Sequence, residues 1–378
     1  MEKDRGLIML RLRIKDTTGS LRSHKTPFFP KFVLQREGET DQEDWIRLEV
    51  FDGDEKTVWK KEKGIYYFDQ YYFLAGKPGR YFIKYLYFNF GGYTRQVGYR
   101  QERTSNWLNI PLYTALDLKN DGLVSLGMID FELNSVQATK GRGKSYNYTL
   151  RFDDSQGQRD RIFKRFQASY PLLSKKYMDH RIAGRPFFGF YANFNRHLHP
   201  ASDESRRWHR LYGEKCRIVI RREGKRALVL EGRYSDANKH GYSTMKEVLA
   251  LPNAYTIHYK MRWIEGVKDA VYGFLIRQNA KNFYYFGVTA AGTPIVWIKK
   301  EGKWIESPKV NRISQFLSSP EQPDDFKIDF KDGVFTYRIN DRVASTFKDV
   351  LGNSRAKIGF FVSGTQKVTV DSIAISGR

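Results

Sequence analysis

The sequence predicts an all-β protein, and three observations carry this prediction. Aromatic residues make up 15% of the 378 residues, with 24 Tyr and 27 Phe, and aromatic residues favour strands over helices. Short aromatic and β-branched runs alternate with turn residues along most of the chain, which is typical of antiparallel strands. Helical periodicity is convincing in one segment only, at about residues 158–170.

The length of the chain predicts more than one domain, because 378 residues exceed what one hydrophobic core usually organises. We expect two β-sandwich domains joined by a short helical connector. The first domain takes residues 1–135, the connector takes residues 136–184, and the second domain takes residues 185–378.

In the first domain, apolar and polar residues alternate clearly in Leu10–Ile14 and Ile46–Val50. The expected strands are Leu7–Ile14, Lys31–Gln35, Trp45–Phe51, Thr57–Lys60, Tyr66–Leu74, Gly79–Phe88, Asn106–Pro111 and Leu123–Leu133. Pro78 between Gly76 and Gly79 predicts a tight turn, because Pro fixes φ and Gly accepts positive φ. We expect the strands on either side of this turn to form a hairpin.

The order of an aromatic strand, a Pro-Gly turn and a Tyr-rich strand resembles a known module. It is similar to the prealbumin-like, or carboxypeptidase-regulatory, β-sandwich modules of bacterial envelope proteins. Their L-x-P-G-x-Y turn corresponds to Leu74–Tyr81 of this sequence. The resemblance concerns residues 1–135 and implies a small β-sandwich there.

The connector contains one more strand-like run, Tyr146–Phe152, and then the helix. Ile162, Phe166 and Tyr170 fall on one apolar stripe at helical spacing, and a second helical turn is expected over Leu172–His180. Basic residues occupy much of the opposite face of the helix. We interpret this face as solvated, and docking to a phosphate or a membrane surface is the alternative.

The second domain is organised around three consecutive strands, Tyr272–Gln278, Asn282–Val288 and Pro294–Lys300. Short turns join them, which predicts an antiparallel meander. Asp332-Gly333 and Asn340-Asp341 accept positive φ, so we expect hairpins at both pairs. The other expected strands are Cys216–Arg221, Ala227–Glu231, Tyr255–Trp263, Phe326–Phe330, Val334–Ile339, Lys357–Val362 and Val368–Ile375.

This order resembles the concanavalin A-like lectin/glucanase fold, in the branch of LamG and 3-keto-disaccharide hydrolase-like domains. The resemblance rests on a long strand after Leu251-Pro252, two hairpins and a closing pair of strands. The residues that carry the hairpins and the closing pair are Gly273, Phe274, Arg277, Phe283, Tyr284, Phe286, Asp332, Gly333, Tyr337, Asn340, Ile358, Gly359, Phe360, Val368, Asp371 and Ile373. It implies a concanavalin A-like jelly roll over residues 187–378, with a sugar bound on one exposed face.

Glucanases of this fold carry catalytic carboxylates on one strand in an E-x-D-x-x-E pattern, because retaining hydrolysis needs an acid and a nucleophile close together. Residues 187–378 contain no such motif. We therefore expect non-catalytic binding of a glycan or a cell-envelope partner through the second domain. A carbohydrate-active hydrolase of the 3-keto-disaccharide hydrolase type is the alternative, and an adhesin-like binder of anionic polymers is a third reading.

Aromatic rings of the second domain are the candidate sugar platforms, because the C–H faces of a pyranose pack on such rings. The candidate ligand-binding residues are Arg277, Tyr285, Trp297, Trp304 and Trp263. The alternative places part of these rings in the core. We expect no catalytic residue, metal site or cofactor; His197 and His199 beside Pro200 indicate a loop rather than a metal site.

The net charge is +23, and it concentrates in residues 151–250, where 22 Lys and Arg stand against 11 Asp and Glu. Such a basic balance attracts anionic partners, and general solubility is the alternative. Acidic polysaccharide is the anionic partner we expect, rather than nucleic acid. Residues 221–226 have the pattern of a charged hairpin tip. The candidate anion-binding residues are Arg206, Arg207, Arg210, Arg221 and Arg222.

No apolar run is long enough for a transmembrane helix, and the first residues do not resemble a signal peptide. Cys216 is the only cysteine, which excludes an intramolecular disulfide. We expect a basic extracytoplasmic or cell-envelope protein in its mature form, of the lipoprotein kind, whose targeting segment has been removed. A cytoplasmic location is the alternative.

Overall fold

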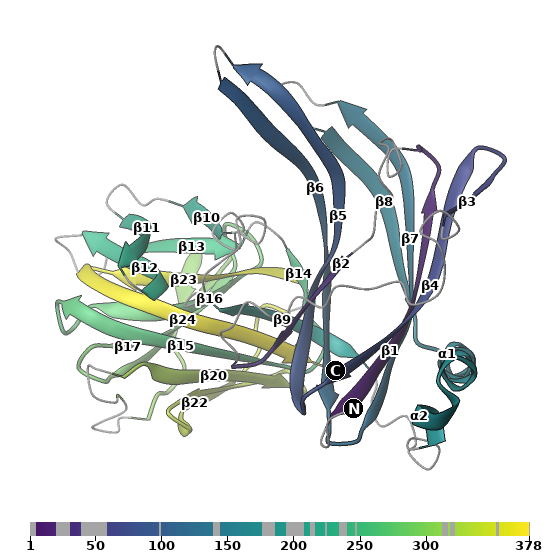
Figure 1. Cartoon of the computed structure of the whole chain (residues 1–378). Coiled ribbons are helices and arrows are strands. Elements are labelled where there is room, and N and C mark those ends of the chain that lie inside the picture. Colours follow the sequence, from purple (N-terminus) through teal and green to yellow (C-terminus); the bar gives the residue numbers. More distant parts are fainter. Residues whose placement is uncertain are drawn as a thin grey trace. The chain divides into compact units, whose positions relative to one another are not determined.

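The computed structural model describes residues 5–19, 31–38, 59–97, 100–138, 144–175, 186–193, 208–211, 216–223, 225–233, 240–245, 248–311, 317, 322–352 and 355–377. The described residues up to Phe187 form one compact unit, and those from Phe188 onward form a second. Strands dominate both units, which confirms the all-β prediction (Figure 1).

Two sheets build the first unit. The strands are β1 (Gly6–Asp16), β2 (Lys31–Arg36), β3 (Trp59–Glu62), β4 (Ile65–Gly76), β5 (Gly79–Val97), β6 (Arg100–Leu118), β7 (Leu123–Ala138) and β8 (Lys144–Asp153). One sheet has the order β3-β4-β1-β7-β8, and β1 and β7 run parallel in it. In the other sheet, β5 pairs with β2 and β6. The expected strand Trp45–Phe51 lies outside the described residues.

The central strand β1 separates two apolar layers, because successive side chains of a strand point to opposite faces. Leu10 and Leu12 are fully buried in the main core, together with Leu86 of β5 and Ile110 of β6. Leu7 points to the other face and belongs to a second, smaller cluster. One sheet therefore has apolar contacts on both sides.

The helices α1 (Gln156–Ser169) and α2 (Pro171–Lys175) form the partner of that second face (Figure 1). Ile162 and Phe166 are fully buried there against residues of β1 and β7. The ring of Phe166 lies 5.1 Å from the ring of Phe73 on β4. The predicted apolar stripe of the helix is confirmed, and its role is to cover this sheet.

Residues 136–184 were expected to be a connector, and the structure differs on this point. β8 pairs with β7 from Met128↔Asp153 to Ala138↔Lys144, and α1 packs on the same sheet. The described residues of this stretch are therefore part of the first unit. Sequence periodicity identified the strand and the helix but carries no information about where they pack.

The Pro-Gly turn also differs from its prediction. β4 pairs with β1 and β3, whereas β5 pairs with β2 and β6, so the two strands belong to different sheets. The Tyr81 hydroxyl donates to the Lys77 carbonyl across the turn at 2.8 Å, and Gly79 has a φ of 145°. The turn lies where expected, but the hairpin prediction is wrong, because turn residues redirect a chain without choosing its partner strand.

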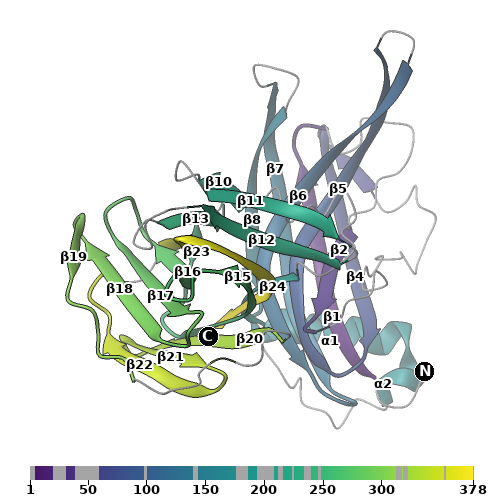
Figure 2. The ribbon, with the colours of Figure 1, turned by 90° about the vertical axis from the view of Figure 1, so that its left-hand side faces the viewer.

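The second unit consists of two antiparallel sheets (Figure 2). The meander sheet has the order β10-β13-β23-β16-β17-β18-β19, with β14 beside β23. Its strands are β10 (Trp208–Leu211), β13 (His240–Met245), β14 (Leu249–Ala250), β16 (Val271–Arg277), β17 (Phe283–Thr289), β18 (Pro294–Lys300), β19 (Lys303–Ile305) and β23 (Arg355–Ser363). The predicted meander is confirmed as β16–β18.

The facing sheet has the order β24-β15-β20-β21-β22. On the other side of β24, β12 pairs with its first half and β9 with its second half, and β11 pairs with β12. The strands are β9 (Phe187–Asn193), β11 (Cys216–Glu223), β12 (Lys225–Arg233), β15 (Tyr255–Gly266), β20 (Asp324–Lys331), β21 (Val334–Ile339), β22 (Arg342–Lys348) and β24 (Thr365–Gly377).

Turn chemistry fixes the hairpins of the facing sheet. Asp332 and Gly333 have φ of 52° and 73°, and Asn340 and Asp341 have φ of 48° and 63°. Two successive residues with positive φ match the right-handed twist of the strands they join. Both predicted hairpins are confirmed, as β20–β21 and β21–β22.

Aromatic rings from both sheets fill the core of the second unit. The ring of Tyr259 on β15 stacks on Phe326 of β20 at 5.0 Å and lies 5.1 Å from Phe274 of β16. Phe360 of β23 meets Phe274 edge-on at 5.3 Å. Two antiparallel sheets packed face to face around such a core make the second unit a β-sandwich, as predicted. No described helix is long and apolar enough to cross a membrane.

Candidate functional site

The outer face of the meander sheet carries the candidate site. Alternation directs Phe274 and Phe286 into the core, and so directs Arg277, Tyr285 and Trp297 to the opposite face. Strand register then brings further rings to the same face. We call this surface the aromatic face and define it by Tyr242, Phe283, Tyr285, Trp297, Trp304 and Phe361.

Tyr285 is the centre of the aromatic face. Its ring lies 4.6 Å from Phe361, 5.1 Å from Phe283 and 6.0 Å from Trp304. The imidazole of His240 meets it edge-on at 5.1 Å. Tyr285 is only 2% exposed, and burial raises the pKa of its hydroxyl well above the usual range. Tyr285 therefore supports the surface from below and is not itself an open platform.

Trp304 is the open platform of the aromatic face, because 51% of its surface is exposed. Its ring is held between Tyr285, Phe283 at 5.9 Å and Trp297 at 6.4 Å. The Lys299 ammonium lies 5.4 Å from the ring centres of both Phe283 and Trp304. The indole is thus fixed in place by aromatic neighbours while one side of it meets solvent.

Glycines make room for the rings. Gly273 and Gly287 lie directly opposite each other on β16 and β17. A Cβ atom at position 287 would lie 2.9 Å from the ring carbon Cζ of Phe361 and 2.7 Å from a methyl group of Val271. The Phe361 ring therefore needs the glycine at position 287, whereas a Cβ atom at position 273 would lie 2.1 Å from the Phe286 carbonyl oxygen of the neighbouring strand.

Arg277 is fixed at the edge of the aromatic face by three contacts. Its Nη1 donates to the Tyr242 hydroxyl at 3.1 Å, and its Nε donates to the Asn279 carbonyl at 3.1 Å. The guanidinium carbon also lies 5.4 Å from the centre of the Tyr242 ring, a cation–π distance. The side chain is therefore preorganised, and part of its hydrogen-bonding capacity is left over.

Strand register arranges cations and rings in one row across the sheet. Lys357 of β23 is opposite Arg277 of β16, which is opposite Phe283 of β17. Phe283 is opposite Lys299 of β18, which is opposite Trp304 of β19. Residues opposite each other in a sheet share a face, so three cations and two rings stand side by side. We call these five residues the cation–aromatic row.

Four of the five predicted ligand-binding residues lie together on this face: Arg277, Tyr285, Trp297 and Trp304. The fifth, Trp263, lies on β15 in the facing sheet, opposite Val368 of β24. It does not share the site. Local sequence shows that Trp263 ends a strand but not which sheet the strand joins.

The predicted anion-binding arginines are not assembled by the described residues. Arg206 and Arg207 lie outside them, and Arg210 is opposite Ser243 on β10 and β13. Arg221 and Arg222 lie on β11, which forms a hairpin with β12 up to Glu223↔Lys225. The expected hairpin tip is thus confirmed, whereas anion binding there stays a prediction. His197 and His199 also lie outside the described residues.

Sequence reasoning missed several residues of the face: His240, Tyr242, Phe283, Lys299, Lys357 and Phe361. Alternation within β17 and β18 could have found Phe283 and Lys299, since each is two residues from a predicted platform. The others depend on the pairing of β23 with β13 and β16. Such long-range register has no local signal.

The described strands of the meander sheet contain no Asp or Glu. Their charged residues are Arg210, Arg277, Lys299, Lys300, Lys303, Arg355 and Lys357. In the facing sheet, β20 alone carries three aspartates. The described strands that carry the aromatic face therefore bear positive charge only, whereas the exposed Glu301 and Glu306 lie just before and just after β19. No group of three His, Cys, Asp or Glu among the described residues could hold a metal ion.

The sequence matches no family model, and no curated protein matches it. Solved structures do match, over about half of this chain. A carbohydrate-binding module from Bacillus subtilis shares 14% identity over 45% of this chain and 96% of the module, with a TM-score of 0.33. A Bacillus subtilis protein of unknown function with a galectin-like fold shares 12% identity over 50% of this chain and 94% of its own, with a TM-score of 0.37.

The Bacillus licheniformis β-glucanase shares 10% identity over 50% of this chain and 98% of its own, with a TM-score of 0.36. At such identities a likeness concerns the fold and not the chemistry of the protein.

Proposed function

We propose that this protein binds glycans without catalysis, through the aromatic face of its second unit. The observation that carries the proposal is the half-exposed indole of Trp304, held by an aromatic cluster on the side of the meander sheet that faces away from the core. Large aromatic side chains are usually buried, and an indole that stays half-exposed on an aromatic surface indicates a binding partner. A pyranose offers that partner, because its C–H face is apolar and its hydroxyls can stay in water.

The absence of carboxylates from the described strands of the meander sheet favours binding over hydrolysis. Glycoside hydrolysis needs two carboxylates on either side of the scissile bond, and these strands supply cations and aromatic rings instead. Arg277 and Lys299 can donate to sugar hydroxyls from the rim. This arrangement suits recognition, in which rings provide contact area and a few polar groups fix orientation.

The test is a glycan array with the whole chain, followed by calorimetry on the best ligand. We expect Trp304→Ala to weaken binding at least tenfold, the loss of about 1.4 kcal/mol. The matched control is Phe152→Ala, which removes a ring that is 43% exposed on the first unit and should leave affinity unchanged. Equal loss in both variants, or turnover of a chromogenic glycoside by the wild type, would contradict the proposal.

A further inference from the structure

We infer that the aromatic face selects acidic glycans, in which the sugar ring packs on Trp304 and its carboxylate or sulfate group is bound by Lys299. This inference rests on the proposed function and names its ligand class. Two features of the described residues carry it: the contact of the Lys299 ammonium with the exposed Trp304 ring, and the opposed cations Arg277 and Lys357.

The first feature is the contact between cation and platform. The Lys299 ammonium lies over the exposed Trp304 ring, 5.4 Å from its centre, and the two residues are opposite each other on β18 and β19. A pyranose stacked on the indole would therefore place its ring substituents next to the ammonium. An anionic substituent gains a charge-assisted hydrogen bond there, which is stronger than one to a neutral hydroxyl.

The second feature is an unfavourable pair of charges. Arg277 and Lys357 lie directly opposite on β16 and β23, and like charges in this position destabilise a sheet. Neither residue forms an ion pair with a described carboxylate, in contrast to Arg11 with Asp69 in the first unit. Repulsion of this kind is relieved when an anion binds between the two cations.

Arg277 is prepared for this role. Its contacts with Tyr242 and Asn279 hold the guanidinium at the rim, so little side-chain entropy is lost when a ligand binds. The guanidinium fork matches both carboxylate and sulfate. The cation–aromatic row thus has Lys299 beside the Trp304 platform and the pair Arg277 and Lys357 further along. Arg277 lies two strands from Lys299, a separation of about 10 Å at the usual strand spacing.

The experiment measures affinity of the whole chain by calorimetry at about 150 mM salt, where charges beyond roughly 8 Å are screened. The probes are oligogalacturonate for the carboxylate, a heparin oligosaccharide for the sulfate, a neutral dextran oligosaccharide of equal length, and polyphosphate as an anion without sugar rings. We expect at least one acidic oligosaccharide to bind ten times tighter than dextran or polyphosphate.

The variants are Lys299→Gln and Arg277→Gln, each checked for an unchanged circular dichroism spectrum. Each should lower the affinity for the acidic oligosaccharide by about tenfold, within the range for hydrogen bonds to charged groups. Each should lower the affinity for dextran much less, by about twofold, because a neutral hydroxyl loses a weaker hydrogen bond than a carboxylate or sulfate. Lys260→Gln is the control, because it removes an exposed cation from the facing sheet and should change affinity less than twofold.

The outcomes separate the inference from the proposed function. Equal affinity for dextran and acidic oligosaccharides would overturn the inference while the proposed function stands. Equal binding of polyphosphate, or an equal effect of Lys260→Gln and Lys299→Gln, would also overturn it, since net charge alone would then explain the attraction. Failure to bind any oligosaccharide would overturn both.

Discussion

Tyr272 is a residue whose buried hydroxyl lowers the stability of the second unit. It is fully buried among aromatic rings, and its hydroxyl has no hydrogen-bond partner among the described residues. A buried unpaired hydroxyl costs about 1–3 kcal/mol. We therefore expect Tyr272→Phe to raise the free energy of unfolding by about 1 kcal/mol at pH 8, as measured by urea denaturation.

The same residue makes stability depend on alkaline pH. Burial raises the pKa of Tyr272, and likewise of Tyr259, well above the ordinary value. In the unfolded chain these hydroxyls ionise at about pH 10, whereas the folded state keeps them neutral. Stability is therefore fully present below about pH 10 and is lost as the pH rises beyond it.

Between pH 8 and about pH 10.5, we expect Tyr272→Phe to lose less stability than the wild type, in urea titrations followed by tryptophan fluorescence. The wild type in the same titration is the reference. Identical losses in the two proteins would show that the Tyr272 hydroxyl does not stay neutral in the folded state.

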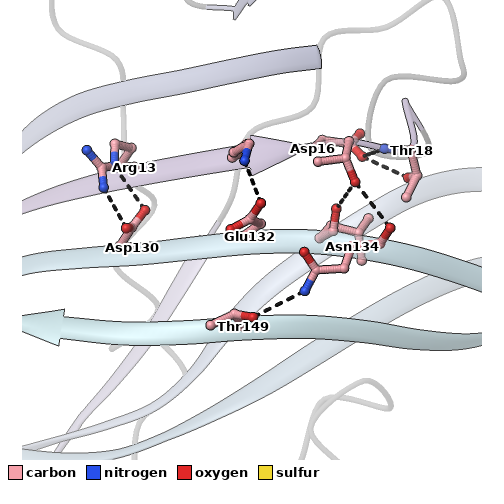
Figure 3. Close-up of polar contacts among 10 residues, drawn as sticks. Arg13, Asp16, Thr18, Asp130, Glu132, Asn134 and Thr149 are labelled. Carbon is pink, nitrogen blue, oxygen red and sulfur yellow. Dashed lines mark hydrogen bonds and ion pairs between the residues drawn. The ribbon is translucent and has the colours of Figure 1, made fainter. Parts of the chain in front are cut away.

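At the level of elements, β1 shows which of its two faces stabilises the first unit. Its outer face forms a ladder of ion pairs, in which Arg13 donates to Asp130 at 2.9 Å and 2.6 Å, and Lys15 donates to Glu132 at 2.6 Å (Figure 3). Arg13 is 45% exposed, and an exposed pair contributes about 0–1 kcal/mol. Its inner face instead buries apolar side chains completely.

We expect Leu10→Ala to cost about 2–5 kcal/mol, because it leaves a cavity in a close-packed core. Asp130→Asn, which breaks the ladder beside it, should cost no more than about 1 kcal/mol. Urea denaturation of the two variants compares the faces directly, and Arg13→Met serves as the control for the other half of the pair. A larger loss in Asp130→Asn than in Leu10→Ala would reverse this ranking.

The elements also show how far local sequence carries a prediction. Alternation and turn pairs located β16, β17 and β18 within one residue at each end, because strands and hairpin turns depend on residues that are neighbours in the sequence. The parallel pairing of β1 with β7 and the sheet change after Gly76 were missed, because partner choice depends on packing between distant segments. For the same reason Trp263 was wrongly predicted to share the site, and Tyr242 and Phe361 were not predicted to belong to it.

At the scale of the whole molecule, the net charge of +23 will attract many polyanions without any specific site. Such attraction acts over roughly 30 Å at 10 mM ionic strength and only about 8 Å at 150 mM. A contact between a sugar ring and an indole does not depend on this distance. Salt therefore separates attraction by the whole molecule from binding by the aromatic face.

We expect the wild type and Trp304→Ala to elute at the same salt concentration from a sulfopropyl cation exchanger, since the substitution leaves the charge unchanged. On a heparin column of the same charge density, the wild type should elute later than Trp304→Ala, because the resin adds pyranose rings that pack on the indole. Co-elution of the two proteins on both columns would mean that the basic charge of the chain accounts for all of its affinity, and that the exposed indole serves another purpose.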